Sequence, residues 1–264
     1  MGNVRELPGK SLNPKRRRFG RVRAFTTLSF ALGRVPLWLV TKPRSRRAKT
    51  MERRFFKQIA RGFGLEIVVS GQPAASALYV SNHISWADIP ILASLLDADF
   101  IAKSEVGRWP VIGPLARRFG TILIERDKKI RIGDQADAIH AHLRAGRSAI
   151  LFPEGTTSDG TGILPFRTSL FAAATGAHVV QPVVIRYLDP EGAPLAPARQ
   201  REIAWIDDDA LVGGAAKVAR ARTRALVQFL PPLDPRAFAD RKAFAEAARS
   251  AMAAAYAAAP NLPR

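Results

Sequence analysis

The sequence predicts an α/β protein whose mixed central sheet is flanked by helices, with a helical arm in front of it. From residue 62 onward, short runs of valine, isoleucine and leucine alternate with segments of helical spacing, the order typical of an α/β sandwich. Several apolar runs are continuous, as expected for strands that are covered on both faces. The chain has 264 residues, 47% of them hydrophobic, which suffices for one sizeable folded body.

The predicted elements of the body are strands and helices in alternation. The strands are expected at residues 65–69, 77–81, 99–102, 121–124, 148–152, 179–186, 202–206 and 225–230. The helices are expected at residues 84–96, 110–118, 130–145 and 165–175, and an Ala-rich helix within 236–259. We therefore divide the chain into an arm (1–61), an α/β body (62–235) and a C-terminal helix with its tail (236–264).

The arm carries almost all of the excess positive charge. Residues 1–61 contain 18 Lys and Arg and two acids, a net charge of +16, whereas the other 203 residues contain 23 bases and 20 acids. The body is therefore close to neutral. The arm is expected to attract a polyanion, either a nucleic acid or an anionic membrane surface.

An apolar run, residues 24–40, lies between two basic clusters of the arm, 15–23 and 42–49. Its large side chains recur at steps of three and four, which places them on one face of a helix. They are Phe25, Leu28, Leu32, Val35 and Leu39. The run has 17 residues and is interrupted by Arg34 and Pro36, so it is shorter than a membrane-spanning helix requires. It predicts a membrane-associating helix that lies in the bilayer interface or dips shallowly into it.

The aromatic side chains of the arm favour a membrane surface over a nucleic acid. Phe25, Phe30 and Trp38 lie inside the apolar run, whereas a nucleic-acid groove interleaves aromatic and basic residues. No nucleic-acid partner is therefore expected. An alternative stays open, in which the helix simply packs on the body and its charges are solvated. Basic and proline residues at 43–46 replace the small residues of a signal-peptide cleavage site, so export is not expected.

Composition and motifs exclude several classes of chemistry. The chain has no cysteine, so it has no disulfide, thiolate nucleophile or Cys-ligated metal. It also contains no Gly-x-Ser-x-Gly elbow, phosphate-binding Walker loop or dinucleotide fingerprint. Hydrolases with a nucleophile elbow, NTPases and dehydrogenases therefore lose their usual support.

Among the four histidines, His83 is the candidate for catalysis. It directly follows an apolar strand, and sites in open α/β sheets lie off the carboxyl ends of strands. A helix that begins near residue 85 would return Asp88 towards His83, where a carboxylate would orient the imidazole as a general base. By contrast, His140 and His142 are expected to be solvated or to lie at the rim of the fold, and His178 to be packed at the start of a strand.

Two further strand ends carry polar residues. Residues 152–160 form a turn with glycines, hydroxyls and carboxylates that is suited to an anionic group. Arg126 follows the predicted strand 121–124, where its guanidinium would bind a phosphate or carboxylate.

Four blocks of sequence together resemble the glycerolipid acyltransferase family, which includes the bacterial 1-acylglycerol-3-phosphate acyltransferases. The first block is Asn82-His83 with Asp88, an HX4D motif. The others are residues 100–126, with Trp109-Pro110; residues 152–167, with Phe-Pro-Glu-Gly-Thr; and the proline-containing strand 180–185. The resemblance covers about residues 69–187.

The resemblance implies an acyltransferase that works without an acyl-enzyme. His83 would deprotonate the hydroxyl of a lysolipid acceptor, and Asp88 would orient the histidine. The donor would be acyl-CoA or acyl-ACP, and no cofactor or metal would be needed. The implied substrate-binding residues are Asn82, Lys103, Arg126, Glu154, Gly155, Thr156 and Arg167.

The implied acceptor is 1-acylglycerol-3-phosphate, which would give phosphatidic acid. One position departs from the family pattern: Thr157 stands where an Arg or Lys often follows the Gly-Thr of the third block. The alternative acceptor is therefore a lysolipid without phosphate, such as a lyso-ornithine lipid. The expected location is the cytoplasmic face of the inner (plasma) membrane, peripheral or monotopic, and the basic arm is also suited to docking an acidic acyl carrier protein.

Overall fold

The computed structural model describes residues 14–33, 36, 38, 40–42, 44–110, 112–124, 139–172, 174, 177–206, 211–260 and 262. Its centre is a sheet of seven strands in the order β1-β7-β6-β2-β5-β3-β4. The strands are β1 (Leu65–Ser70), β2 (Leu78–Ser81), β3 (Ala98–Lys103), β4 (Ile122–Ile124), β5 (Ser148–Leu151), β6 (Val180–Leu188) and β7 (Thr223–Phe229). Strands β6 and β7 pair antiparallel and all other neighbours pair parallel, so the predicted mixed sheet is confirmed.

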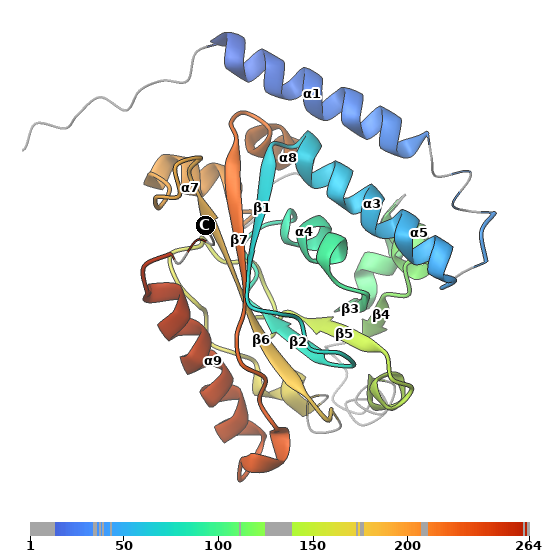
Figure 1. Cartoon of the computed structure of the whole chain (residues 1–264), viewed down its shortest axis with the longest axis vertical. Helices are drawn as coiled ribbons and strands as arrows, with labels where there is room; N and C mark the ends of the chain where they lie inside the picture. The colour runs from blue at the N-terminus through green and yellow to red at the C-terminus, as the bar shows by residue number, and fades with distance from the viewer. Residues whose placement is uncertain are drawn as a thin grey trace, which may run out of the picture.

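Helices cover both faces of the sheet (Figure 1). On one face α3 (Arg46–Gly62) packs on α4 (Asp88–Leu95), and on the other α9 (Arg241–Ala257) lies against β6. Each face has its own apolar core, one around Ile91, Leu92 and Ile185 and the other around Phe171, Phe244 and Met252. Burial from both sides explains why the strands are continuous apolar runs.

Further helices surround this core. They are α1 (Pro14–Leu32), α5 (Ile112–Arg118), α7 (Pro197–Ile203) and α8 (Leu211–Val218), with the 3-10 turns η1 (Ser104–Arg108), η3 (Thr168–Ala172) and η5 (Pro235–Ala237). Among them α1 packs on α3 and α7 packs on α8. Residues 139–144 are also helical, within the predicted helix 130–145, whose first part lies outside the described residues.

Three predicted elements differ from the structure. Residues 202–206 are not a strand, because Pro197 opens helix α7 and the Arg199 side chain bonds the carbonyls of Lys217 and Val218 at 2.9 Å. Residues 165–175 contain the short turn η3 in place of an α-helix. Helix α4 begins at residue 88, later than the predicted residue 84, because the intervening residues form a turn around the Asp88 carboxylate.

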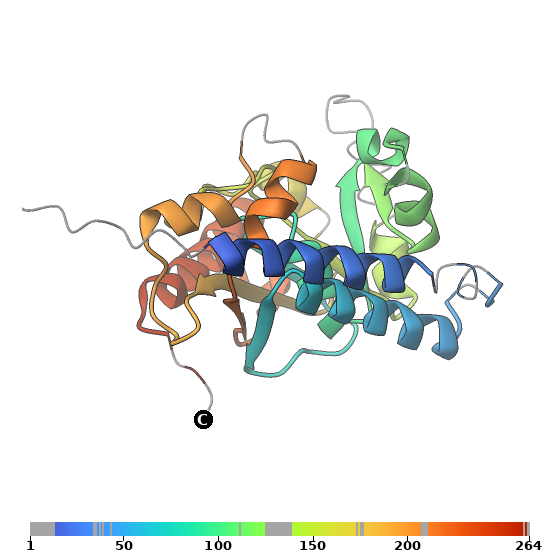
Figure 2. The same ribbon diagram turned by 90° about the horizontal axis from the view of Figure 1, so that it is seen from above.

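The arm contributes two helices, which lie side by side in Figure 2. Helix α1 begins at Pro14, directly before the first basic cluster, and ends at Leu32, so it covers only the first half of the predicted helical run. Its side chains Phe25, Leu28 and Leu32 are exposed to 72%, 37% and 44%, while Val35 and Leu39 lie outside the described residues. Within the described part of the chain, no helix has the length and hydropathy needed to cross a membrane.

Helix α3 is joined to the body although it belongs to the basic arm. Its residues Ala48, Ile59 and Ala60 are buried. The Ser45 side chain caps its first turn and accepts a hydrogen bond from the Ala48 N–H at 3.2 Å. The division of the chain at residue 61 stays a prediction. Physically, α3 forms part of the layer that covers one face of the sheet.

Candidate active site

The carboxyl ends of β2 and β5 bring together two of the segments that the sequence singles out. His83 follows β2 after one residue, and residues 152–155 follow β5, which pairs in parallel with β2. The two segments are joined directly, because the Ser158 N–H donates to the His83 carbonyl at 2.7 Å. Parallel pairing of the strands therefore places both segments at one edge of the sheet.

His83 and Asp88 form a hydrogen-bonded pair. The Nδ1 atom of His83 lies 2.8 Å from Oδ2 of Asp88. The same carboxylate oxygen accepts the backbone N–H groups of Ile84 at 2.7 Å and Ser85 at 2.8 Å, which closes the turn before α4. A negative side chain in the first turn also suits the positive end of the helix dipole.

The His83 ring packs on an aromatic neighbour without being fully buried. The ring stacks on Phe152, with centroids 4.0 Å apart and planes 15° apart, and the side chain is 16% exposed. Because Asp88 accepts a hydrogen bond from Nδ1, the neutral ring carries its proton there. The unprotonated Nε2 is then the atom able to take a proton from a hydroxyl.

Asp88 has a partner that the sequence did not reveal. The Tyr187 hydroxyl donates to Oδ1 of Asp88 at 2.6 Å, from a position 99 residues further along the chain. Tyr187 lies on β6 two residues after Ile185, and both side chains belong to the core under α4. Alternation along the strand could have placed Tyr187 on this face, but its contact with Asp88 depends on the pairing of β6 with β2.

Glu154 links the segment after β5 to the residues around it. Its Oε2 accepts the His83 N–H at 3.1 Å, and its Oε1 accepts the Leu164 N–H at 3.0 Å. Burial raises the pKa of this carboxyl to about 7, against the lowering effect of the two hydrogen bonds, and the charge of Asp88 raises it further. Glu154 therefore holds the backbone of His83 in place.

Gly155 and Arg167 lie against each other beside Glu154. Gly155 has a φ of +72°, and a Cβ at this position would lie 2.6 Å from Nε of Arg167. The backbone conformation therefore favours glycine, and a side chain at this position would also displace the Arg167 guanidinium. The backbone N–H of Arg167 donates to the Pro153 carbonyl at 2.9 Å. Thr156, on the same turn as Gly155, is exposed.

The other candidate substrate-binding residues have different positions. Asn82 is buried, and its side-chain amide makes two hydrogen bonds to the backbone of Ile185, at 3.0 and 2.8 Å. These bonds tie β2 to β6. Lys103 is exposed at the carboxyl end of β3, and Arg126 lies outside the described residues.

Two other histidines differ from the sequence prediction. His142, expected to be solvated or at the rim of the fold, is buried, with Nε2 3.1 Å from the Ser148 carbonyl and 3.5 Å from Oδ2 of Asp99. Its helix turns this side chain onto the start of β5. His178, expected to be packed, is exposed, because β6 begins only at residue 180.

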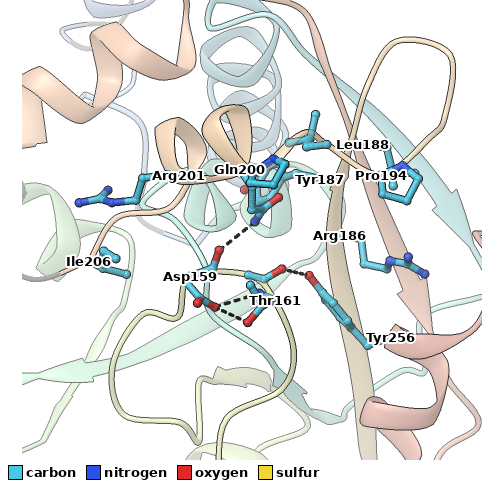
Figure 3. Close-up of a pocket in the computed structure, with 13 residues that line it drawn as sticks. Asp159, Thr161, Arg186, Tyr187, Leu188, Pro194, Gln200, Arg201, Ile206 and Tyr256 are labelled. Carbon is cyan, nitrogen blue, oxygen red and sulfur yellow. Dashed lines mark hydrogen bonds between the residues drawn. The ribbon is translucent and has the colours of Figure 1, made fainter. Parts of the chain in front are cut away.

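A pocket of about 510 Å³ lies beyond the end of β6 (Figure 3). Tyr187 forms part of its wall, together with Gln200, Ile206 and Tyr256. The Tyr256 hydroxyl donates to the Gly160 carbonyl at 2.6 Å, and the Gln200 amide donates to the Asp159 carbonyl at 3.1 Å. These contacts hold the loop after the Phe-Pro-Glu-Gly-Thr segment against α9 and α7.

Residues 65–186 match the family model named Acyltransferase. A lyso-ornithine lipid O-acyltransferase of Brucella abortus is 35% identical over 85% of this chain and 88% of its own length. This chain belongs to the Acyltransferase family. The match therefore confirms the resemblance that the four blocks indicate.

Other relatives of this acyltransferase carry two kinds of name. A lyso-ornithine lipid O-acyltransferase of Rhizobium meliloti is 38% identical over 67% of this chain, and this chain spans 62% of that relative's length. A 1-acyl-sn-glycerol-3-phosphate acyltransferase of Neisseria gonorrhoeae is 38% identical over 49% of this chain and 51% of its own length.

The fold of this acyltransferase is also found in a solved structure. The crystal structure of the 1-acyl-sn-glycerophosphate (LPA) acyltransferase PlsC from Thermotoga maritima has a TM-score of 0.63, with 19% sequence identity. The match covers 91% of this chain and 96% of the solved one. The likeness in fold therefore extends well beyond the residues that match the family model.

Proposed function

We propose that this acyltransferase transfers a fatty acyl chain to the hydroxyl of a lysolipid, and that a lyso-ornithine lipid is its preferred acceptor. The main support is the similarity to the relative from Brucella abortus, whose name gives this acceptor and which is matched along 88% of its length. The relative named for 1-acyl-sn-glycerol-3-phosphate is similar over only about half of each chain. This order reverses the sequence-based prediction, which put the phosphate-bearing acceptor first.

Thr157 supports the same preference. A phosphate acceptor would gain from a cation after the Gly-Thr pair, but the Thr157 hydroxyl donates instead to the carbonyl of Trp205. The Trp205 N–H in turn donates to the Ile84 carbonyl at 2.9 Å. Thr157 thus joins the turn to residues 204–206. The site has one cation fewer for a head group than a sequence with Arg or Lys at this position.

The proposed reaction is direct transfer from a thioester. Nε2 of His83 takes the proton of the acceptor hydroxyl while its oxygen attacks the thioester carbonyl carbon. The tetrahedral intermediate collapses with cleavage of the C–S bond, and the thiolate takes the proton back from His83. Asp88 stabilises the imidazolium that exists between these steps. The donor is acyl-CoA or acyl-ACP, and its thioester is already activated.

We place the enzyme on an anionic membrane surface, at the cytoplasmic face of the inner membrane. The support is helix α1, which exposes Val22, Phe25 and Phe30 to between 54% and 72%. Such side chains enter the interface while basic residues of the arm attract anionic lipid. Acyl carrier protein, which is acidic, is a second proposed partner for the same charges.

A panel of acceptors tests the proposed function. Purified protein is mixed with a long-chain acyl-ACP or acyl-CoA and either lyso-ornithine lipid or 1-acylglycerol-3-phosphate, and release of free thiol is measured. We expect turnover with both acceptors to depend on His83, and kcat/KM to be higher for lyso-ornithine lipid. A higher kcat/KM for the phosphate acceptor would reverse the proposed preference. Absence of turnover with every lysolipid would reject the proposed reaction.

A further inference from the structure

The two oxygens of the Asp88 carboxylate have different partners. Oδ2 accepts from His83 and from two backbone N–H groups, whereas Oδ1 accepts from the Tyr187 hydroxyl at 2.6 Å. Asp88 is completely buried, so water does not replace a missing donor there. The Tyr187 hydroxyl is therefore the contact that distinguishes one carboxylate oxygen from the other.

Tyr187 is held rigidly as a donor. Its ring is buried in the core under α4, and its backbone pairs with Ala225 of β7. Burial, followed by the negative charge of Asp88, raises the pKa of the Tyr187 hydroxyl well above its ordinary value. The hydroxyl thus stays protonated over the whole range in which a histidine titrates.

We propose that Tyr187 is a positioning residue of the acyl transfer, which orients the Asp88 carboxylate towards His83. It also stabilises the deprotonated form of the His83–Asp88 dyad, in which the imidazole is neutral and the carboxylate is ionised. The proposal rests on the proposed function, since it assigns His83 the role of base. Tyr187 acts through Asp88 and need not touch the acyl donor or the acceptor. Its effect is on the geometry and the proton affinity of the dyad.

The direction of the effect follows from the coupling of the two residues. A neutral donor to Oδ1 stabilises the carboxylate most when no proton is on the dyad, because an imidazolium already neutralises part of the charge. Loss of the donor therefore makes binding of the first proton tighter, whether that proton lies on His83 or on Asp88. The pH below which the dyad is protonated rises.

Other titratable groups face this dyad from the surrounding elements. Glu154, on the segment after β5, bonds the His83 backbone and interacts with the charge of Asp88. Tyr256, on α9, interacts with Tyr187 and Asp88, and burial raises the pKa of Tyr256 to about 12. Glu154 is the group that titrates near neutral pH, so a Glu154→Gln background separates its effect from that of Tyr187.

The test compares Tyr187→Phe with Tyr79→Phe. Each change removes one hydroxyl from a buried tyrosine. Tyr79 lies on β2, and its hydroxyl donates to the Ala74 carbonyl and not to Asp88. For Tyr187→Phe we expect kcat to fall roughly ten-fold or more, KM to stay within about two-fold, and the acid limb of kcat/KM to move up by about one pH unit. Tyr79→Phe keeps the wild-type kcat and acid limb.

A second variant moves the limb in the opposite direction. Site-specific 3-fluorotyrosine at position 187 keeps the shape of the ring but makes the hydroxyl a stronger donor, so the acid limb is expected to move to lower pH. An unchanged acid limb in both variants would overturn the proposal. A raised KM with unchanged kcat in Tyr187→Phe would also overturn it, because Tyr187 would then contact a substrate.

Imidazole NMR separates this proposal from the proposed function. The chain has four histidines, and His83→Gln assigns the His83 signals. The titration midpoint of His83 is expected to be higher in Tyr187→Phe than in the wild type, with no substrate present. A shifted midpoint without turnover rejects the acyl transfer only, whereas turnover with an unshifted midpoint rejects the role of Tyr187.

Discussion

His83 and His142 each lie beside a buried aspartate, but the two pairs have different surroundings. His83 lies at the carboxyl edge of the sheet, 2.8 Å from Asp88, whose other partners are neutral donors. His142 lies at the amino edge, 3.5 Å from Asp99, which also binds Arg44 at 3.0 Å and Lys49 at 3.3 Å. The cations satisfy Asp99, so its charge is not directed at one histidine.

The difference shows that a histidine beside an aspartate does not by itself make a general base. Among the residues that the structure describes, no lysine or arginine bonds the Asp88 carboxylate, so an imidazolium is the positive charge it can stabilise. The Asp99 cluster instead ties the arm to β3, because Arg44 and Lys49 belong to the arm. The first pair is suited to catalysis and the second to holding two parts of the chain together.

The largest expected effect is the loss of catalysis when His83 is changed. His83→Gln removes the base, and we expect kcat to fall by a factor of roughly 10³ or more. His142→Gln is the matched control and is expected to keep kcat within a few-fold, because its ring does not face the site. Steady-state rates with lyso-ornithine lipid measure both. Equal losses in the two variants would break the distinction between the pairs.

Glu154 is expected to make the stability of the protein depend on pH. Its pKa is about 7 in the folded state and has an ordinary value of 4.5. The contribution of this group to stability is therefore fully present below pH 4.5 and is lost as the pH rises to about 7, an effect of roughly 3 kcal/mol.

Glu154→Gln removes this pH dependence. Between pH 4.5 and pH 8, the free energy of unfolding of the variant is expected to rise by roughly 3 kcal/mol relative to the wild type. Urea unfolding at several pH values measures it. Glu66→Gln serves as the control, since the Glu66 side chain is 63% exposed on β1. A constant difference between Glu154→Gln and the wild type across this range would contradict the raised pKa.

Asp99→Asn is expected to reduce stability and spare catalysis. It leaves Lys49 and Arg44 without their shared carboxylate, and because both cations are partly exposed we expect a loss of about 2 kcal/mol. Asp88→Asn should show the reverse, with a large loss of kcat. Urea unfolding and steady-state rates on both variants test these opposite expectations. A loss of activity in Asp99→Asn under conditions where that variant is fully folded would contradict them.

The smallest expected effect concerns the exposed face of the arm. Phe25→Ser with Val22→Ser removes apolar area from α1 and should weaken binding to anionic vesicles several-fold, about 1 kcal/mol, with stability unchanged. Thr26→Ala with Ser29→Ala changes exposed polar positions of the same helix and should leave binding intact. Co-sedimentation reports both, and undiminished binding by the apolar double variant would place the membrane contact elsewhere.

Local sequence signals predicted most of the fold. Continuous apolar runs located seven strands to within a few residues, and the Ala-rich tail located α9. Segment 202–206 was wrongly predicted as a strand because its short apolar pattern does not distinguish a strand from the end of a helix. The predicted helix 165–175 is also wrong. The short turn η3 lies there, and Phe171 of this turn packs in the core.

Sequence alone determined the pairing of His83 with Asp88, because one turn of chain suffices to bring residues five apart together. It also determined the separation of charge between arm and body. Only the tertiary structure decided that Tyr187 completes the Asp88 carboxylate and that His142 is buried against Asp99. Both contacts join segments far apart in the sequence, and their partners are set by strand pairing and packing, which no local pattern encodes.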